Sequence, residues 1–304
     1  MTASPVIRVI RPGDTSKLNP YTVAIVANPA LEVPWQSGAF SPDPIMLDHL
    51  AFEESVNYIE QALFGSLPGQ REQFINDPTI GPHIRVVSVF DVGLTATYQN
   101  SLVAQDGASN QLIARRSVFV PFLSTYNLDA DVIYAVSKSA THTRATSWFT
   151  SDDDARPGIP FAMDGRPLVH RFYNLIPGTV AIHTTNRSLI ALHEFGHAAS
   201  SYTNGAVFDL YIDLGPSINK KLNRPIPVVY GNYNSAVMSS DRTRGGIGYP
   251  PTWMTYHCEL LDAAFPGVMD DYLRAASHVP EDCQHDRITR QFLIDRLRAK
   301  ISRP

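Results

Sequence analysis

The sequence has little of what defines several large classes of protein, beginning with cysteine. Its 304 residues include only Cys258 and Cys283. Two cysteines are too few for a disulfide framework, although they could form one bridge. The cysteine content therefore excludes a disulfide-stapled fold and leaves both oxidising and reducing compartments open.

Long apolar runs and clusters of basic residues are also missing. No apolar stretch approaches the roughly 20 residues that a membrane-spanning helix requires, and residues 1–20 lack the apolar core of a Sec-type signal peptide. We therefore expect no membrane span, and either a cytoplasmic location or export by another route. The net charge is −4 and no Lys/Arg block is present, so we expect no nucleic acid partner.

The composition is that of a folded protein without a flexible linker. Hydrophobic residues make up 44% of the chain and charged residues 18%, and no Gly/Ser-rich segment separates independent domains. We expect one folded unit of the α+β class, built on a mixed, mainly parallel, twisted sheet. Residues 1–205 would form an N-terminal subdomain that ends in a helix described below. Residues 206–304 would form a mostly helical or irregular subdomain that closes the cleft.

Local patterns predict the main elements. Apolar and β-branched runs predict strands at residues 21–27, 83–92 and 131–136 and an edge strand at 179–184, and helical spacing predicts helices at 47–64 and 281–301. The first helix would bury Leu50, Val56, Ile59 and Leu63 and stop at Gly65. Residues 137–177 read as irregular. We expect the acidic run at residues 152–154 within them to be a solvated loop.

A further helix carries the chemistry. Asn186 is expected to cap a helix that runs to about Tyr202, with Leu189, Leu192 and Ala199 packed on the sheet. The pattern predicts that the opposite face of this helix points toward a cleft.

On that face lies the motif His193-Glu194-Phe195-Gly196-His197. Two histidines four positions apart on a helix face the same side, so both imidazoles can reach one metal ion with the glutamate beside it. Zinc binds imidazole nitrogen at about 2.0–2.1 Å, and a catalytic site keeps one of its four positions for water. The motif predicts that His193 and His197 bind Zn²⁺ and that Glu194 is the general base that takes a proton from the water.

A catalytic zinc requires a third protein ligand, which the helix cannot supply. A three-histidine extension would need Gly and His where the chain has Ser200 and Thr203, so that subtype is excluded. Asp209 is the favoured ligand because it follows the helix closely. Glu259 is the main alternative, and Asp213 is a weaker one that better suits a second-shell partner to a histidine.

The reaction also needs a hydrogen-bond donor for the oxyanion. Zincins commonly use Tyr or His opposite the base, and the candidates here are Tyr211, Tyr249, Tyr256 and His257. Most tyrosines in a protein are packing residues, so each of these is one option among several. The histidines elsewhere in the chain favour ordinary structural roles: His183 would be a hydrogen-bonded strand residue or line the cleft edge, and His285 has no partner at ligand spacing.

Downstream features add a family resemblance. Met238 lies in a small-polar stretch suited to a methionine turn below a metal. The sequence resembles the IgA-peptidase-like zinc metallopeptidases over roughly residues 179–260. The elements that carry this resemblance are the pentapeptide, Asp209-Leu210-Tyr211, Met238, and Gly248-Tyr249-Pro250-Pro251 leading to Cys258. Leu210 stands where that family has an acidic residue, and the family's cysteine-rich C-terminal signature is missing. The resemblance implies a metzincin-like fold with peptidase activity.

The leading hypothesis is therefore a zinc-dependent metallopeptidase of zincin type that hydrolyses a peptide or protein substrate. The alternative is a zinc-stabilised binding or interaction protein on a zincin scaffold that has lost hydrolysis. A third reading, in which the pentapeptide is a coincidence on a core helix, predicts no bound metal.

Overall fold

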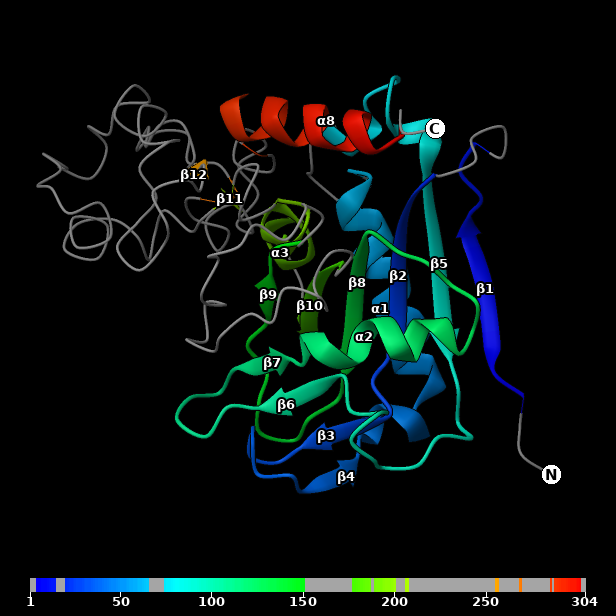
Figure 1. The fold of residues 1–304 in the computed structure, drawn as a ribbon, viewed down its shortest axis with the longest axis vertical. Helices are drawn as coiled ribbons and strands as arrows, with labels where there is room; N and C mark the ends of the chain where they lie inside the picture. The colour runs from blue at the N-terminus through cyan, green and yellow to red at the C-terminus, as the bar shows by residue number, and fades with distance from the viewer. Residues whose placement is uncertain are drawn as a thin grey trace, which may run out of the picture.

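The computed structural model describes residues 4–14, 20–65, 74–150, 177–186, 189–200, 206–207, 255–256, 268–269, 285 and 287–301. These residues form a mixed α and β structure with helices on both faces of a central sheet (Figure 1). The expected α+β class and mixed sheet are confirmed.

The described elements are as follows. The strands are β1 (Val6–Arg11), β2 (Tyr21–Ala27), β3 (Ala30–Glu32), β4 (Phe40–Pro42), β5 (Ile84–Phe90), β6 (Val103–Gln105), β7 (Leu112–Ala114), β8 (Val132–Ser137), β9 (Thr146–Trp148), β10 (Gly178–His183), β11 (Ala206–Val207) and β12 (Thr255–Tyr256). The α-helices are α1 (His49–Leu63), α2 (Arg116–Ser124), α3 (Ile190–Ala198) and α8 (Arg287–Ile301). The 3-10 helices are η1 (Pro44–Leu47), η2 (Phe74–Asn76) and η3 (Gly81–His83).

The main sheet has the strand order β1-β5-β2-β8-β10-β9. Its four inner strands are parallel, and the edge strands β1 and β9 are antiparallel to their neighbours. A smaller sheet has the order β4-β3-β6-β7, and β11 pairs in parallel with β12. The expectation of a mixed, mainly parallel sheet therefore holds for the main sheet.

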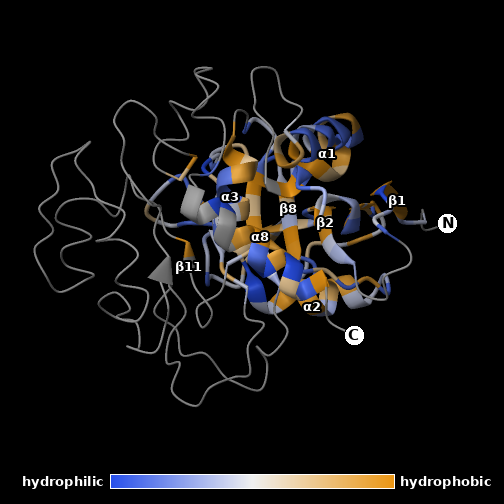
Figure 2. Cartoon of the chain, turned by 90° about the horizontal axis from the view of Figure 1, so that it is seen from above, coloured by the Kyte–Doolittle hydropathy of each residue, from blue (hydrophilic) through white to orange (hydrophobic). Residues whose placement is uncertain are grey.

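Successive side chains of the buried strands point to opposite faces of the sheet, so the fold has two hydrophobic cores. In β2, Val23 and Ile25 face a core shared with α1, α3 and α8, whereas Ala24 and Val26 face a core shared with α2 and the small sheet. Figure 2 shows α1 and α2 on opposite sides of the apolar strands β2 and β8. Burial on both faces explains why these strands read as continuous apolar runs.

Three predicted strands are confirmed with small shifts in their ends, but the fourth was wrong in its position within the sheet. The strand expected at the edge, β10, is an interior strand between β8 and β9 and is buried along its whole length. The edge strand next to β10 is β9, three residues within the segment expected to be irregular. A three-residue strand is too short to show a sequence period, which is why it escaped prediction.

The first predicted helix is also confirmed with corrections. It begins at His49, because the Asp48 side chain accepts a hydrogen bond from the Ala51 backbone N–H at 3.0 Å and caps it. Leu50 was expected in the core and is 69% exposed. Gly65 adopts a φ of 71°, as expected for the residue that ends a helix.

Two groups of buried polar side chains stabilise the small sheet, and the first of them joins it to the main sheet. Asp43 is 0% exposed and accepts four hydrogen bonds, from Asn28 Nδ2, Ser137 Oγ, and the backbone N–H groups of Ile45 and Lys138. Asn28 Oδ1 in turn accepts from the backbone N–H of Leu102 at 2.9 Å. This network fixes the carboxyl ends of β2 and β8 against β6.

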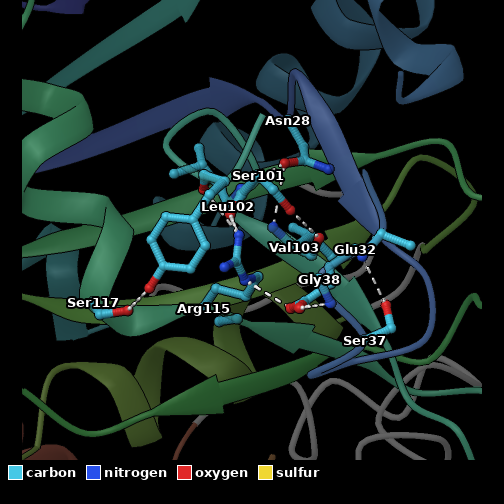
Figure 3. Close-up of polar contacts among 12 residues, drawn as sticks. Asn28, Glu32, Ser37, Gly38, Ser101, Leu102, Val103, Arg115 and Ser117 are labelled. Carbon is cyan, nitrogen blue, oxygen red and sulfur yellow. Dashed lines mark hydrogen bonds and ion pairs between the residues drawn. The ribbon is translucent and has the colours of Figure 1, made fainter. Parts of the chain in front are cut away.

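The second group is an ion pair at the start of α2. Arg115 Nε lies 2.9 Å from Glu32 Oε2, and the guanidinium also donates to the Ser101 carbonyl at 2.7 Å (Figure 3). The Arg115 guanidinium carbon lies 4.4 Å from the centre of the Tyr98 ring. Both charged side chains are buried, and each has a hydrogen-bonding partner of opposite charge. The ion pair therefore holds β3 against the start of α2 and the loop before β6.

The C-terminal helix α8 packs against the rest of the fold, as expected. It buries Leu293 and Leu297 in the core that contains α1, and Lys300 Nζ lies 3.0 Å from Asp131 Oδ1 beside β8. Among the described helices, none combines the length and apolar character needed to cross a membrane. The division at residue 205 stays a prediction.

Candidate metal centre

The helix α3 presents the pentapeptide, but it begins later than predicted. Asn186 was expected to cap the helix, which instead starts at Ile190. The Asn186 side chain closes a turn back onto β10, because its Oδ1 accepts from the His183 backbone N–H at 2.7 Å and its Nδ2 donates to the Thr143 carbonyl. Leu192 is buried against the sheet as expected.

The two motif histidines face each other across one turn of α3. His193 Nε2 and His197 Nε2 are 3.3 Å apart, and the ring planes are at 86°. The other nitrogen of each ring is held by a backbone carbonyl. His193 Nδ1 lies 2.9 Å from the Val268 oxygen, and His197 Nδ1 lies 2.6 Å from the Val207 oxygen.

These contacts select the tautomer that each imidazole adopts in its neutral form. A carbonyl oxygen only accepts hydrogen bonds, so each Nδ1 carries the hydrogen and each Nε2 presents a lone pair. Two facing lone pairs repel unless a proton or a metal cation lies between them. Two ligands at about 2.0–2.1 Å from zinc, at the tetrahedral angle, are about 3.3–3.4 Å apart. The donor set therefore fits two of the four positions of a zinc ion, in both chemistry and spacing.

The glutamate of the motif is held by a hydrogen bond from the edge strand of the sheet. Glu194 is 8% exposed, and its Oε2 accepts a hydrogen bond from Ser147 Oγ at 2.6 Å. Ser147 lies in the edge strand β9, so the carboxylate is fixed between helix and sheet edge. Sequence reasoning did not select Ser147, because a serine 47 residues from its partner leaves no local pattern.

A turn at Val268 and Met269 packs on the helix at Gly196. A Cβ added to Gly196 would lie 2.9 Å from Met269 Sδ and 2.9 Å from His285 Nε2. Burial, together with nearby His193 and His197, lowers the pKa of His285 to about 3, so this histidine is neutral. Among the described residues, Met269 is the methionine that contacts the helix at Gly196. Met238, which was expected to form a methionine turn, lies outside the described residues.

The remaining site predictions fall largely outside the described residues. These are the proposed ligands Asp209, Asp213 and Glu259 and the proposed donors Tyr211, Tyr249 and His257. Tyr256 is described only as a backbone position in β12, where it pairs with Val207. Within the described part of the chain, no group of three or more His, Cys, Asp or Glu side chains is placed to hold a metal. His285 therefore does not complete a ligand set with His193 and His197.

The other histidine considered from the sequence has a structural role. His183 Nε2 lies 2.9 Å from the Ser139 carbonyl oxygen, and its Nδ1 lies 2.7 Å from Thr185 Oγ1. This favours the hydrogen-bonded interpretation over a place at the cleft edge.

Comparisons with known proteins give no match: no protein-family model, no curated protein and no solved structure matches the chain. The functional argument is therefore built on the geometry of α3 and its neighbours.

Proposed function

We propose that the chain is a zinc-dependent metallopeptidase of zincin type. The observation that carries the proposal is the pair of Nε2 atoms 3.3 Å apart, each on a ring whose Nδ1 is held by a backbone carbonyl. Backbone carbonyls that orient ligand imidazoles in this way are a usual support of zinc sites. The zincin-like fold is part of the proposal, and it requires a sheet edge beside the motif helix, the place that β9 occupies beside α3.

In this proposal the chain's own residues divide the chemistry between them. A zinc ion held by His193 and His197 would lower the pKa of a coordinated water toward ~7 and polarise the substrate carbonyl. Glu194 takes a proton from the attacking water and delivers it to the leaving amine, a role worth about 10²–10⁴-fold in rate. Ser147 holds the Glu194 carboxylate.

The third ligand is proposed from the sequence positions of the acids. Asp209 is the second residue after Val207, whose carbonyl oxygen accepts from His197. Glu259 is the third residue after Tyr256, which pairs with Val207 in the two-stranded sheet. Both acids therefore stay open, with Asp209 favoured. Measuring zinc affinity in D209A and E259A distinguishes them, because losing a ligand weakens binding far more than losing a bystander.

The test of the proposal is Glu194→Gln. We expect E194Q to retain about one zinc per chain and to lose at least 100-fold in peptide cleavage, because the amide cannot accept the proton. Cleavage is measured by mass spectrometry on a defined mixture of synthetic peptides, and zinc by elemental analysis of protein purified without added metal. The control is H49A, which removes a half-exposed histidine at the start of α1, outside the motif.

The same measurement separates the alternative function. A zinc-stabilised binding protein would hold zinc and cleave no peptide in either form. Equal cleavage by wild type and E194Q would contradict the assignment of Glu194 as the base. Absence of bound metal, with no gain on adding zinc, would contradict the proposed centre itself.

A further inference from the structure

We propose that Ser147 is a positioning residue that holds Glu194 in the orientation its chemistry requires, an inference that rests on the proposed function. Ser147 occupies the middle of the three-residue edge strand β9, opposite Val180 of β10. Neither the motif nor its spacing assigns a role to this residue.

The pleat of β9 directs Ser147 alone toward the helix. Its neighbours Thr146 and Trp148 point to the opposite face of the sheet, where Thr146 Oγ1 donates to the Leu112 carbonyl and Trp148 Nε1 donates to the Ala114 carbonyl at 3.1 Å. Alternation therefore leaves a single side chain of this strand on the α3 side, and it is a hydroxyl.

The strand and the residues after it are held alongside the helix at three successive levels. Ser147 contacts Glu194, the Phe149 ring centre lies 6.1 Å from that of His197, and the Thr150 backbone N–H donates to the Ser200 carbonyl at 2.9 Å. The partners on the α3 side are three residues apart in each step. The segment that carries Ser147 is thus anchored alongside α3 at His197 and just beyond the last residue of the helix, as well as at Glu194.

The hydrogen bond suits a positioning role. Its length of 2.6 Å is typical of a hydroxyl that donates to an ionised carboxylate. A glutamate has three side-chain torsions, and anchoring Oε2 restricts them while leaving Oε1 to accept a proton. Among the described residues, no hydrogen bond to Oε1 is present. Ser147 would raise the rate by orienting the Glu194 carboxylate, and its loss would leave the metal ligands unchanged.

The test compares three variants of the full chain. S147A removes the hydroxyl, S147T restores one at the same position, and T146V removes a hydroxyl from the opposite face of the same strand. We expect S147A to lower kcat by about 10- to 100-fold, the range of a lost hydrogen bond to a charged group, with little change in KM. S147T should recover most of kcat, and T146V should retain it.

Two readouts are independent of activity. Zinc content and the visible spectrum of the cobalt-substituted protein should be unchanged in S147A, since no ligand is altered. In the metal-free protein, the urea unfolding costs of S147A and E194A should be non-additive by about a tenfold change in the unfolding constant, because each removes the same hydrogen bond.

The outcomes separate the two proposals. Wild-type activity in S147A, failure of S147T to rescue, or loss of zinc in S147A overturns the positioning role while leaving the peptidase proposal in place. Additive unfolding costs overturn it too. A wild-type protein that binds no zinc and cleaves no peptide overturns the proposed function, and the role of Ser147 with it.

Discussion

At the residue scale, each motif histidine is oriented by a backbone carbonyl near its Nδ1 atom, which leaves the two Nε2 atoms facing each other. A spacing of four on a helix predicts that both rings face one side, and the Nε2 separation of 3.3 Å agrees. The supporting atoms are the backbone carbonyls of Val207 and Val268, and any residue type supplies a carbonyl. The sequence therefore carried no signal for them. Ser147 escaped for the related reason that its contact is long-range.

Gly196 gives a prediction at this scale in which two effects oppose each other. Gly→Ala within a helix ordinarily stabilises by about 0.5–1 kcal/mol. Here the added Cβ would meet Met269 Sδ and His285 Nε2 at 2.9 Å, both in buried side chains. Overpacking of a core costs about 1–3 kcal/mol, so G196A should lower the free energy of unfolding.

Urea unfolding of the metal-free protein checks this sign. The helix-propensity control is S55A on α1, which introduces alanine in a helix without adding volume and removes only the hydroxyl that donates to the Ala51 carbonyl. A G196A protein as stable as wild type, or more stable, would show that the turn at Met269 does not pack on the helix as described.

At the element scale, prediction succeeded where burial leaves a long pattern. The strands β2, β5 and β8 are six or seven residues long and apolar on both faces, so their sequence signal is strong. The strands β3, β6, β7 and β9 have three residues each, which is too few to show a period of two. The start of α3 was misplaced because Asn186 makes a local turn that competes with helix capping.

The Asp43 network gives an element-scale prediction. Asp43→Asn replaces an acceptor of four hydrogen bonds by an amide whose NH₂ must face donors, either Asn28 and Ser137 or the two backbone N–H groups. Because the site is buried, we expect D43N to lower the free energy of unfolding by about 2–3 kcal/mol at pH 7. D48N is the control, since asparagine caps a helix as well as aspartate does and the change gives up only the exposed ion pair with Lys138.

The stability difference between wild type and D43N should also depend on pH, and the sign of this dependence follows from the pKa of Asp43. Burial raises the pKa of Asp43 above its ordinary value of 3.8, against the opposing effect of its hydrogen bonds. The native state therefore holds this proton at pH values where the unfolded state has released it, and the contribution of Asp43 to stability grows as pH falls toward 3.8. The stability gap between wild type and D43N should widen from pH 7 to about 4.5. A gap that narrows would contradict the raised pKa.

At the scale of the whole molecule, the proposed centre joins segments that are distant in the sequence. Through their Nδ1 hydrogen bonds, His193 and His197 connect α3 to the turn at Val268 and to β11. The core that buries α3 also contains α1 and α8, so the first and last parts of the chain share one hydrophobic interior. The sequence predicted that the C-terminal helix packs on the rest of the fold, but it carried no sign of which of the two cores the helix joins.

This arrangement predicts the effect of metal removal. Without a cation, two lone pairs face each other at the centre of these contacts, so chelation should lower the thermal midpoint by several degrees. Zinc at 100 times its dissociation constant stabilises by about 2.7 kcal/mol. The midpoint is followed by calorimetry with and without dipicolinate. The H193A/H197A double variant should show no shift on chelation, and a wild type equally unaffected would contradict a metal at this position.

The central claim is that His193 and His197 bind one zinc ion through their Nε2 atoms, and X-ray absorption at the zinc edge tests it most directly. We predict two imidazole nitrogens at about 2.0–2.1 Å, with the remaining positions filled by oxygen and none by sulfur. The nitrogen signal should fall in H197A. Zinc bound without imidazole ligands, or bound equally by wild type and the H193A/H197A variant, would contradict the account.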